Sequence, residues 1–164
     1  ILNSPSNPSG SCYSKSELSS IADVLRQNKH INVITDDIYE YIVYNKFKFH
    51  TLAQVAPDLK DRILTVNGVS KSYCMTGWRI GYAGGNADLI KAMGKLQSQS
   101  TSNPTSISQA AAVEALNGDN SFITERANVF RGRRDFLIKE LNSMNGITCR
   151  VPEGAFYVFL WKKK

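Results

Sequence analysis

The sequence predicts an α/β fold with a mostly parallel sheet and flanking helices. Strand-like and helix-like stretches alternate along the chain, which is typical of strands joined by helical crossovers. The short apolar runs at residues 33–34 and 63–64 are typical of strands that are buried on both faces. With 164 residues, 42% of them hydrophobic, the chain is long enough for about one domain with a sizeable core.

The first helix is predicted to begin after Ser14. Ser14 and Glu17 have the spacing of a capping box, in which each side chain bonds the other residue's backbone N–H at the start of a helix. Apolar residues then recur at helical spacing: Leu18, Ile21, Ala22 and Leu25. Further along, apolar runs predict strands over residues 31–35, 62–66 and 79–83.

Three helices are predicted in the second half of the chain. Asn86 is a suitable N-cap for the first, which extends to about residue 96. The second covers residues 106–116, and the third is a long amphipathic helix over about residues 121–144. A final strand is predicted to begin near Phe156.

Along the last helix the chain is expected to leave the sheet domain. We place the boundary near residues 119–126, so that residues 1–120 belong to a larger domain. Residues 121–164 then form a linking helix and the start of a smaller C-terminal domain. The chain begins at Ile1 rather than Met, and strand-like residues stand at both ends, so we expect a piece of a longer protein.

Composition excludes several classes of function. The net charge of +6 comes without a basic stripe interleaved with aromatics, so no nucleic-acid partner is predicted. No apolar run approaches the roughly 20 residues of a membrane span. The sequence has three cysteines, Cys12, Cys74 and Cys149, which form no CxxC pair and have no metal-ligand spacing with a histidine. We therefore expect no metal site, and reduced thiols in a cytoplasmic protein.

Polar residues follow the predicted strands at the places where ligands bind in open α/β sheets, just beyond the carboxyl ends. Asp36 follows the strand over residues 31–35, and Ser70 and Lys71 lie in the loop after the next strand. Asn7 lies in a turn-rich stretch after an apolar start. A carboxylate, an amine and an amide are therefore expected at one edge of the sheet.

Four segments, in this order, resemble motifs of the class I/II aminotransferases: NSPSNPSG at residues 3–10, DDIY at 36–39, SKSYCMTGWRIGY at 70–82 and PEGAFY at 152–157. Residues 98–104 and 110–116 are in addition similar to bacterial aspartate aminotransferases of the Ib subgroup. The resemblance implies the central and C-terminal part of the large domain of the fold-type-I enzymes that depend on pyridoxal 5′-phosphate (PLP), and the start of their small C-terminal domain.

The resemblance also implies catalytic roles. Lys71 matches the lysine that holds PLP as a Schiff base and then acts as the general base on the substrate. Asp36 matches the carboxylate that keeps the pyridine nitrogen protonated, which lets the ring absorb carbanion charge. Its neighbour Asp37 has the wrong spacing, because the family pattern Asp-x-x-Tyr joins Asp36 to Tyr39.

Other residues are expected to bind the cofactor. Tyr39 and Asn7 match the partners of its phenolic oxygen, whose hydrogen bonds lower the pKa of the Schiff base. Asn7 is also assigned to the α-carboxylate of the substrate, and the Asn7–Pro8 bond is hypothesised to be cis. Arg79, eight residues after Lys71, matches the phosphate-binding arginine, and Ser70 adds a hydroxyl to the same phosphate.

Several conspicuous residues are interpreted as structural. Four aromatic residues are expected to pack rather than stack on a ligand: Tyr73, Trp78, Tyr82 and Phe156. His30 and His50 are expected on the surface or in loops. A run of arginines on the long helix is expected on its solvated face: Arg131, Arg133 and Arg134.

The reaction implied by the resemblance is transamination from an L-amino acid, with L-aspartate favoured, to 2-oxoglutarate, in a homodimer. Ser98 stands where related enzymes carry an arginine for the distal carboxylate. The arginine for the α-carboxylate is expected after Lys164, and the residue that stacks on the cofactor before Ile1. Another aminotransferase specificity, a PLP-dependent β-lyase and a non-catalytic PLP-binding regulator remain as alternatives.

Overall fold

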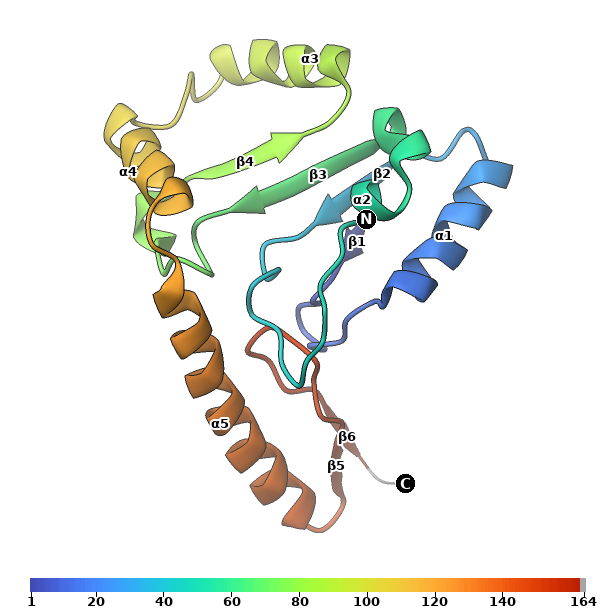
Figure 1. Cartoon of the computed structure of the whole chain (residues 1–164), viewed down its shortest axis with the longest axis vertical. Helices are drawn as coiled ribbons and strands as arrows, with labels where there is room; N and C mark the ends of the chain where they lie inside the picture. Colours follow the sequence, from blue (N-terminus) through green and yellow to red (C-terminus); the bar gives the residue numbers. More distant parts are fainter. Residues whose placement is uncertain (163–164) are drawn as a thin grey trace.

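A four-stranded sheet lies at the centre of the computed structural model, which describes residues 1–162 (Figure 1). Its strands are adjacent in chain order: β1 (Leu2–Asn3), β2 (Val33–Asp36), β3 (Ile63–Gly68) and β4 (Gly81–Gly84). The first three are parallel, and β4 is antiparallel to β3. The carboxyl ends of β1, β2 and β3 therefore lie at one edge, where β4 begins, and the predicted mostly parallel α/β sheet is confirmed.

Helix α1 (Lys15–Gln27) builds the main core beside this sheet. Its capping box forms as predicted, with the Ser14 N–H bonded to Glu17 Oε2 at 2.8 Å and the Glu17 N–H to Ser14 Oγ at 3.3 Å. Its apolar face packs against the short helix α2 (Leu52–Val55), the 3₁₀ helix η1 (Pro57–Arg62) and the start of β3. The buried residues of this core are Leu18, Ala22, Leu25, Leu52, Ala56, Leu59 and Ile63. The sequence had not predicted α2 or η1.

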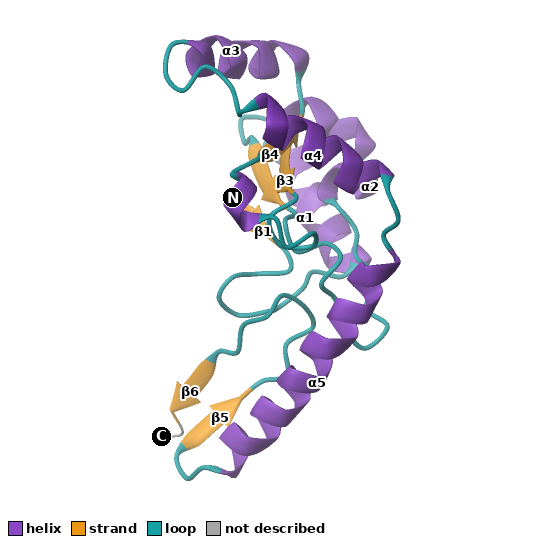
Figure 2. Cartoon of the chain, turned by 90° about the vertical axis from the view of Figure 1, so that its left-hand side faces the viewer, coloured by secondary structure: helices purple, strands orange, loops and turns teal. Residues whose placement is uncertain are grey.

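The second half of the chain is largely helical. A 3₁₀ turn, η2 (Thr76–Trp78), precedes β4, and α3 (Ala87–Ser98) and α4 (Ser106–Asn117) follow it. The long α5 (Ser121–Ser143) then leads away from the sheet to a separate antiparallel pair, β5 (Ile147–Cys149) and β6 (Leu160–Lys162) (Figures 1 and 2). The domain boundary at residues 119–126 stays a prediction.

The last strand begins later than predicted. It starts at Leu160 rather than near Phe156, because residues 152–157 form a loop instead. Ala155 in this loop has a φ of 55°, a left-handed conformation that cannot continue a strand. Strand β5 had no counterpart among the predicted elements.

Some side chains expected to be buried are exposed. Ile34 of β2 is 42% exposed, so the prediction that β2 is covered on both faces is wrong, whereas Ile63 and Leu64 of β3 are buried as expected. Trp78 and Tyr82, expected to pack, are 43% and 41% exposed.

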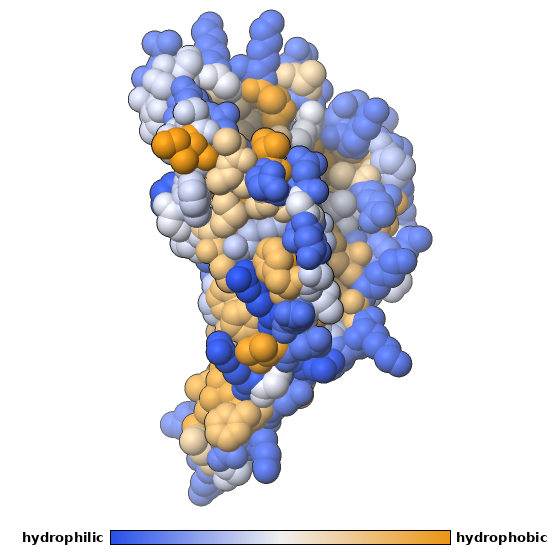
Figure 3. All heavy atoms as spheres, turned by 60° about the vertical axis from the view of Figure 1, so that its left-hand side comes forward, coloured by the Kyte–Doolittle hydropathy of each residue, from blue (hydrophilic) through white to orange (hydrophobic). Residues whose placement is uncertain are grey.

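Apolar side chains are also exposed on α3, α4 and α5, and Figure 3 shows apolar surface spread over this side of the molecule. They include Leu96, Ile107, Val113, Val129 and Phe136. Within the described part of the chain, no helix combines the length and hydropathy that crossing a membrane requires.

Candidate functional site

Asn3 ties two of the predicted site residues to one edge of the sheet. It pairs with Asp36 in the β1–β2 register, and its Nδ2 donates to the Asp36 carbonyl at 3.0 Å. Its Oδ1 accepts a hydrogen bond from the Asn7 backbone N–H at 2.7 Å. The Asn7–Pro8 bond is cis, as hypothesised. Asn7 and Asp36 therefore lie at the same end of the sheet, held through a single side chain.

Lys71 follows the carboxyl end of β3, the strand next to β2. The loop turns around Val69, which is fully buried and whose carbonyl accepts from the backbone N–H of Tyr73 at 3.3 Å. The Lys71 amine lies 6.0 Å from the centroid of the Tyr39 ring and 5.8 Å from that of Phe156. The two ring centroids are 5.4 Å apart, so both rings cover the same side of the amine. A partly desolvated lysine amine is the arrangement that favours nucleophilic attack on an aldehyde.

Tyr39 lies beside Lys71 and packs against the C-terminal loop. It is 3% exposed, and its hydroxyl pairs with that of Tyr157 at 2.7 Å. Its ring meets those of Phe156 and Tyr157 edge to face. Burial raises the pKa of Tyr39 above its usual value. The phenol is therefore protonated near neutral pH and can donate a hydrogen bond.

Ser70 and Arg79 lie at the two ends of the turn that joins β3 to β4. Gly68 and Gly81, which flank this turn, are paired in the antiparallel ladder. Thr76 connects the two: its hydroxyl donates to the Ser70 carbonyl at 3.0 Å, and its carbonyl accepts from Arg79 Nη1 at 2.8 Å. The Arg79 side chain is exposed. The turn thus presents a hydroxyl and a guanidinium, the groups that bind phosphate most readily.

The loop over residues 152–157 is held by hydrogen bonds to three residues, Gly10, Ile42 and Tyr44. The N–H groups of Glu153 and Gly154 both donate to the Gly10 carbonyl, at 3.0 and 2.9 Å. The Ala155 N–H donates to the Ile42 carbonyl at 2.9 Å, and the Tyr44 hydroxyl donates to the Ala155 carbonyl. These bonds fix the loop that brings Phe156 and Tyr157 to Tyr39.

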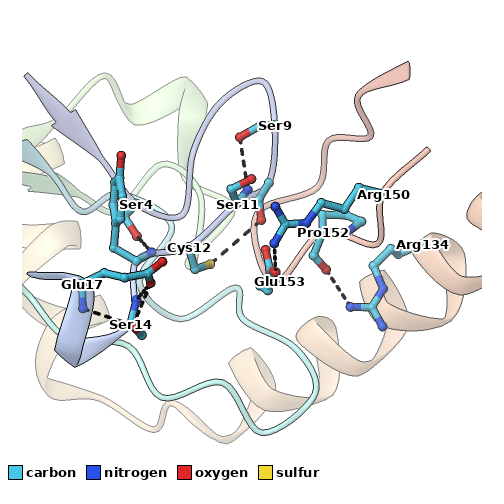
Figure 4. Close-up of polar contacts among 12 residues, drawn as sticks. Ser4, Ser9, Ser11, Cys12, Ser14, Glu17, Arg134, Arg150, Pro152 and Glu153 are labelled. Atoms are coloured by element: carbon cyan, nitrogen blue, oxygen red, sulfur yellow. Dashed lines mark hydrogen bonds and ion pairs between the residues drawn. The ribbon is translucent and has the colours of Figure 1, made fainter. Parts of the chain in front are cut away.

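Arg134 is a correction to the predicted solvated arginine run. Its side chain is buried, and its Nη1 donates to the Pro152 carbonyl at 2.9 Å, as Figure 4 shows beside the Arg150–Glu153 pair. Asn45 Oδ1 and Asp135 Oδ1 accept from its Nη2 at 3.1 and 2.6 Å. Arg131 and Arg133 are exposed, as predicted.

The sequence did not predict that Phe156 and Tyr157 border the site. Phe156 was expected to pack, which it does against Phe130, but it also borders the Lys71 amine. The role of Tyr157 had no signal beyond its place in the PEGAFY motif. His30 and His50 lie outside helices and strands as expected, and the described residues contain no cluster of potential metal ligands.

The donor set fits the expected cofactor. One edge of the sheet collects a carboxylate, an amide, a phenol, a hydroxyl, an amine and a guanidinium: Asp36, Asn7, Tyr39, Ser70, Lys71 and Arg79. A molecule with a basic ring nitrogen, a phenolic oxygen, an aldehyde and a phosphate is complementary to all six: the nitrogen to the carboxylate, the phenolic oxygen to the amide and the phenol, the aldehyde to the amine, and the phosphate to the hydroxyl and the guanidinium.

Comparisons with known proteins agree with this chemistry. A probable aspartate/prephenate aminotransferase of Rickettsia bellii is 60% identical over 98% of this chain and 40% of its own length. The crystal structure of the aspartate aminotransferase from Rhizobium meliloti is 58% identical, with a TM-score of 0.95 over 97% of this chain and 40% of that one. An aromatic aminotransferase from Pyrococcus horikoshii is 36% identical, with a TM-score of 0.92 over 98% and 43%.

The chain thus spans about 40% of the length of the relatives from Rickettsia and Rhizobium. The family model described as aminotransferase class I and II matches residues 1–164, the whole of the sequence. The chain therefore belongs to the class I and II aminotransferases.

Proposed function

We propose that this chain is part of a PLP-dependent aminotransferase that moves the amino group of L-aspartate to 2-oxoglutarate, giving oxaloacetate and L-glutamate. The observation that carries the proposal is the position of the Lys71 amine beside the rings of Tyr39 and Phe156. The sheet edge that carries Lys71 also carries Asp36. Relatives 58–60% identical to this chain are named aspartate or aspartate/prephenate aminotransferases, which supports the choice of substrate.

Each side chain has a distinct task in this proposal. Lys71 binds the cofactor covalently through its amine, and once released it moves the substrate's α-proton as general base. The Asp36 carboxylate accepts a hydrogen bond from the protonated ring nitrogen. Tyr39 and Asn7 donate to the phenolic oxygen, and Asn7 also reaches the substrate's α-carboxylate. Bound PLP supplies an electron sink for the charge left on the α-carbon.

The phosphate site completes the cofactor pocket in the proposal. Arg79 and Ser70 hold the phosphate from the two ends of the β3–β4 turn. A guanidinium can form two parallel charge-assisted bonds to one phosphate, which fixes the cofactor's orientation as well as its charge. The proposal includes a homodimer and the cytoplasmic setting that the sequence predicts.

A second acceptor, prephenate, is a specific alternative. The Rickettsia bellii relative, 60% identical, is named as a probable aspartate/prephenate aminotransferase. Both acceptors use the same Lys71 chemistry, so they differ only in the pocket for the acceptor's distal groups.

The test uses a full-length protein, because the chain spans about 40% of the relatives' length. We define the full-length chimera as Rhizobium meliloti aspartate aminotransferase with its matching segment exchanged for this chain. Incubation with aspartate and 2-oxoglutarate should release oxaloacetate. Borohydride reduction followed by peptide mass analysis should place the cofactor on Lys71, and Lys71→Ala should remove both signals.

Two results would contradict the proposal. Cofactor trapped on another lysine would remove Lys71 from its role. A chimera that binds PLP at Lys71 but forms no oxaloacetate would reject the pair of aspartate and 2-oxoglutarate, and prephenate offered with aspartate would then test the second acceptor. Light scattering of the chimera should give the mass of a dimer.

A further inference from the structure

The hydroxyls of Tyr39 and Tyr157 form a hydrogen-bonded pair across two distant parts of the chain. They lie 2.7 Å apart and 118 residues apart in sequence. Tyr39 follows β2 at the edge of the sheet, whereas Tyr157 lies in the loop before β6. In such a pair one hydroxyl donates and the other accepts, because each carries one proton and two lone pairs.

We propose that Tyr157 is a positioning residue that donates its proton to the Tyr39 oxygen and so directs the Tyr39 proton toward the cofactor. This inference rests on the proposed function, in which Tyr39 donates to the phenolic oxygen of PLP. A hydroxyl with one proton cannot donate to the cofactor and to Tyr157 at the same time. Tyr39 therefore accepts from Tyr157, and accepting that bond makes it a stronger donor.

The surroundings of the pair favour this direction. Tyr39 is 3% exposed, so water has little access to compete with Tyr157 for its oxygen. The charge of Asp36 acts on Tyr39, and the Lys71 amine lies 6.0 Å from the centroid of the Tyr39 ring. Phe156 meets the rings of both tyrosines, with centroids 5.4 Å from Tyr39 and 5.0 Å from Tyr157. The rings are thereby fixed, and each hydroxyl can only rotate about its own C–O bond.

The loop that carries Tyr157 is also fixed before any ligand binds. Gly10, Ile42 and Tyr44 hold its backbone at residues 153–155. Arg134 holds the preceding carbonyl of Pro152. The position of the Tyr157 hydroxyl is therefore set by the fold, which is what a residue that acts through another one requires.

The test is a pH titration of the full-length chimera, in which the absorbance of the Lys71-linked cofactor is measured at each pH. Donation to the phenolic oxygen favours the deprotonated form of this group. Tyr157→Phe should therefore displace the titration to higher pH, by about a two- to fivefold change in the proton dissociation constant. Tyr39→Phe should displace it further in the same direction. The double variant should match Tyr39→Phe alone, because Tyr157 acts through Tyr39.

Two control variants separate this role from a structural one. Tyr44→Phe removes a bond to the same loop without touching the Tyr39–Tyr157 pair. Tyr41→Phe changes an exposed tyrosine two residues from Tyr39. Neither should move the titration, whereas an equal displacement by Tyr44→Phe would reduce Tyr157 to a packing residue.

The outcomes that overturn the inference differ from those that overturn the function. An unchanged titration in Tyr157→Phe, or one displaced to lower pH, would show that Tyr157 does not donate to Tyr39. Absence of Lys71-linked absorbance in the unmodified chimera would overturn the proposed function itself. Thermal unfolding of each variant establishes that the folded protein was titrated.

Discussion

Arg134 donates from Nη1 to the carbonyl of Pro152 at 2.9 Å, which joins α5 to the loop that carries Tyr157. The side chain is buried, and Asn45 accepts a further bond from it. We expect Arg134→Met to lower the free energy of unfolding of the full-length chimera by about 2–4 kcal/mol, because the buried carbonyl and amide lose their donor. Urea unfolding measures this loss.

Arg131 is the matched control for this substitution. It lies on the same helix and carries the same charge, but its side chain is exposed. Arg131→Met should change the free energy of unfolding by no more than about 0.5 kcal/mol. Equal losses in the two variants would show that the net charge of the helix, rather than the bond to Pro152, determines the effect.

Gly154 lies where the loop packs closely against Pro5 and Ile42. A Cβ at this position would lie 2.6 Å from Pro5 Cγ and 2.9 Å from the Ile42 carbonyl oxygen. Gly154→Ala should therefore push the loop away from the sheet edge, at a cost of about 1–3 kcal/mol in unfolding free energy. It should also weaken PLP binding, because Phe156 and Tyr157 move with the loop. Both quantities can be measured in the full-length chimera.

Gly132 provides the contrast within α5. A Cβ at this position meets nothing within 4 Å in the described structure. Gly132→Ala should leave PLP affinity unchanged and raise the free energy of unfolding by about 0.5–1 kcal/mol, because alanine favours a helix interior over glycine. A Gly154→Ala protein that behaves like Gly132→Ala would refute the close approach at Pro5.

Local patterns were enough to predict α1, α3, α4 and α5 and the mostly parallel sheet, but not α2, η1 or β5. The Ser14–Glu17 capping box requires only neighbouring residues, and it fixes the start of α1. Asp36 and Lys71 could be assigned to one edge because they follow adjacent parallel strands, whose carboxyl ends meet in any such sheet. The family motifs supplied their chemical roles.

Features that depend on distant contacts could not be predicted. The Tyr39–Tyr157 pair joins residues 118 positions apart, and neither residue type signals a partner. Arg134 stands beside the exposed Arg133, so charge alone did not distinguish the buried residue from its neighbour. Its burial follows from the path of residues 152–157, where Ala155 takes a positive φ that no local pattern indicated.

Asp37 makes stability depend on pH. Its side chain is 5% exposed, and burial raises its pKa to about 6, with the charges of Glu40 and Asp36 adding to the effect. A raised pKa in the folded state means that the folded protein binds the proton more tightly than the unfolded chain. The stabilisation is complete below the ordinary value of 3.8 and is lost as pH rises through about 6.

We therefore expect Asp37→Asn to be more stable than the unmodified chimera at pH 7, by about 1–3 kcal/mol, and to lose most of that advantage near pH 4. Urea unfolding at a series of pH values gives the difference directly. A difference that stays constant across the series would show that Asp37 does not titrate in the folded protein.

The proposed function predicts that substitutions of two adjacent carboxylates, Asp36 and Asp37, have different effects on the rate of transamination. Asp36→Asn should lower the rate of transamination by about 10²–10³-fold, the loss typical of one preorganised polar group, because an amide cannot hold the proton on the cofactor's ring nitrogen. Asp37→Asn should retain activity within a few fold, since the proposed function gives this buried side chain no contact with the cofactor. Both variants should still show the cofactor trapped on Lys71, so that the difference reports on catalysis rather than on binding. If Asp37→Asn proved the more damaging change, the pairing of Asp36 with Tyr39 in the Asp-x-x-Tyr pattern would be wrong.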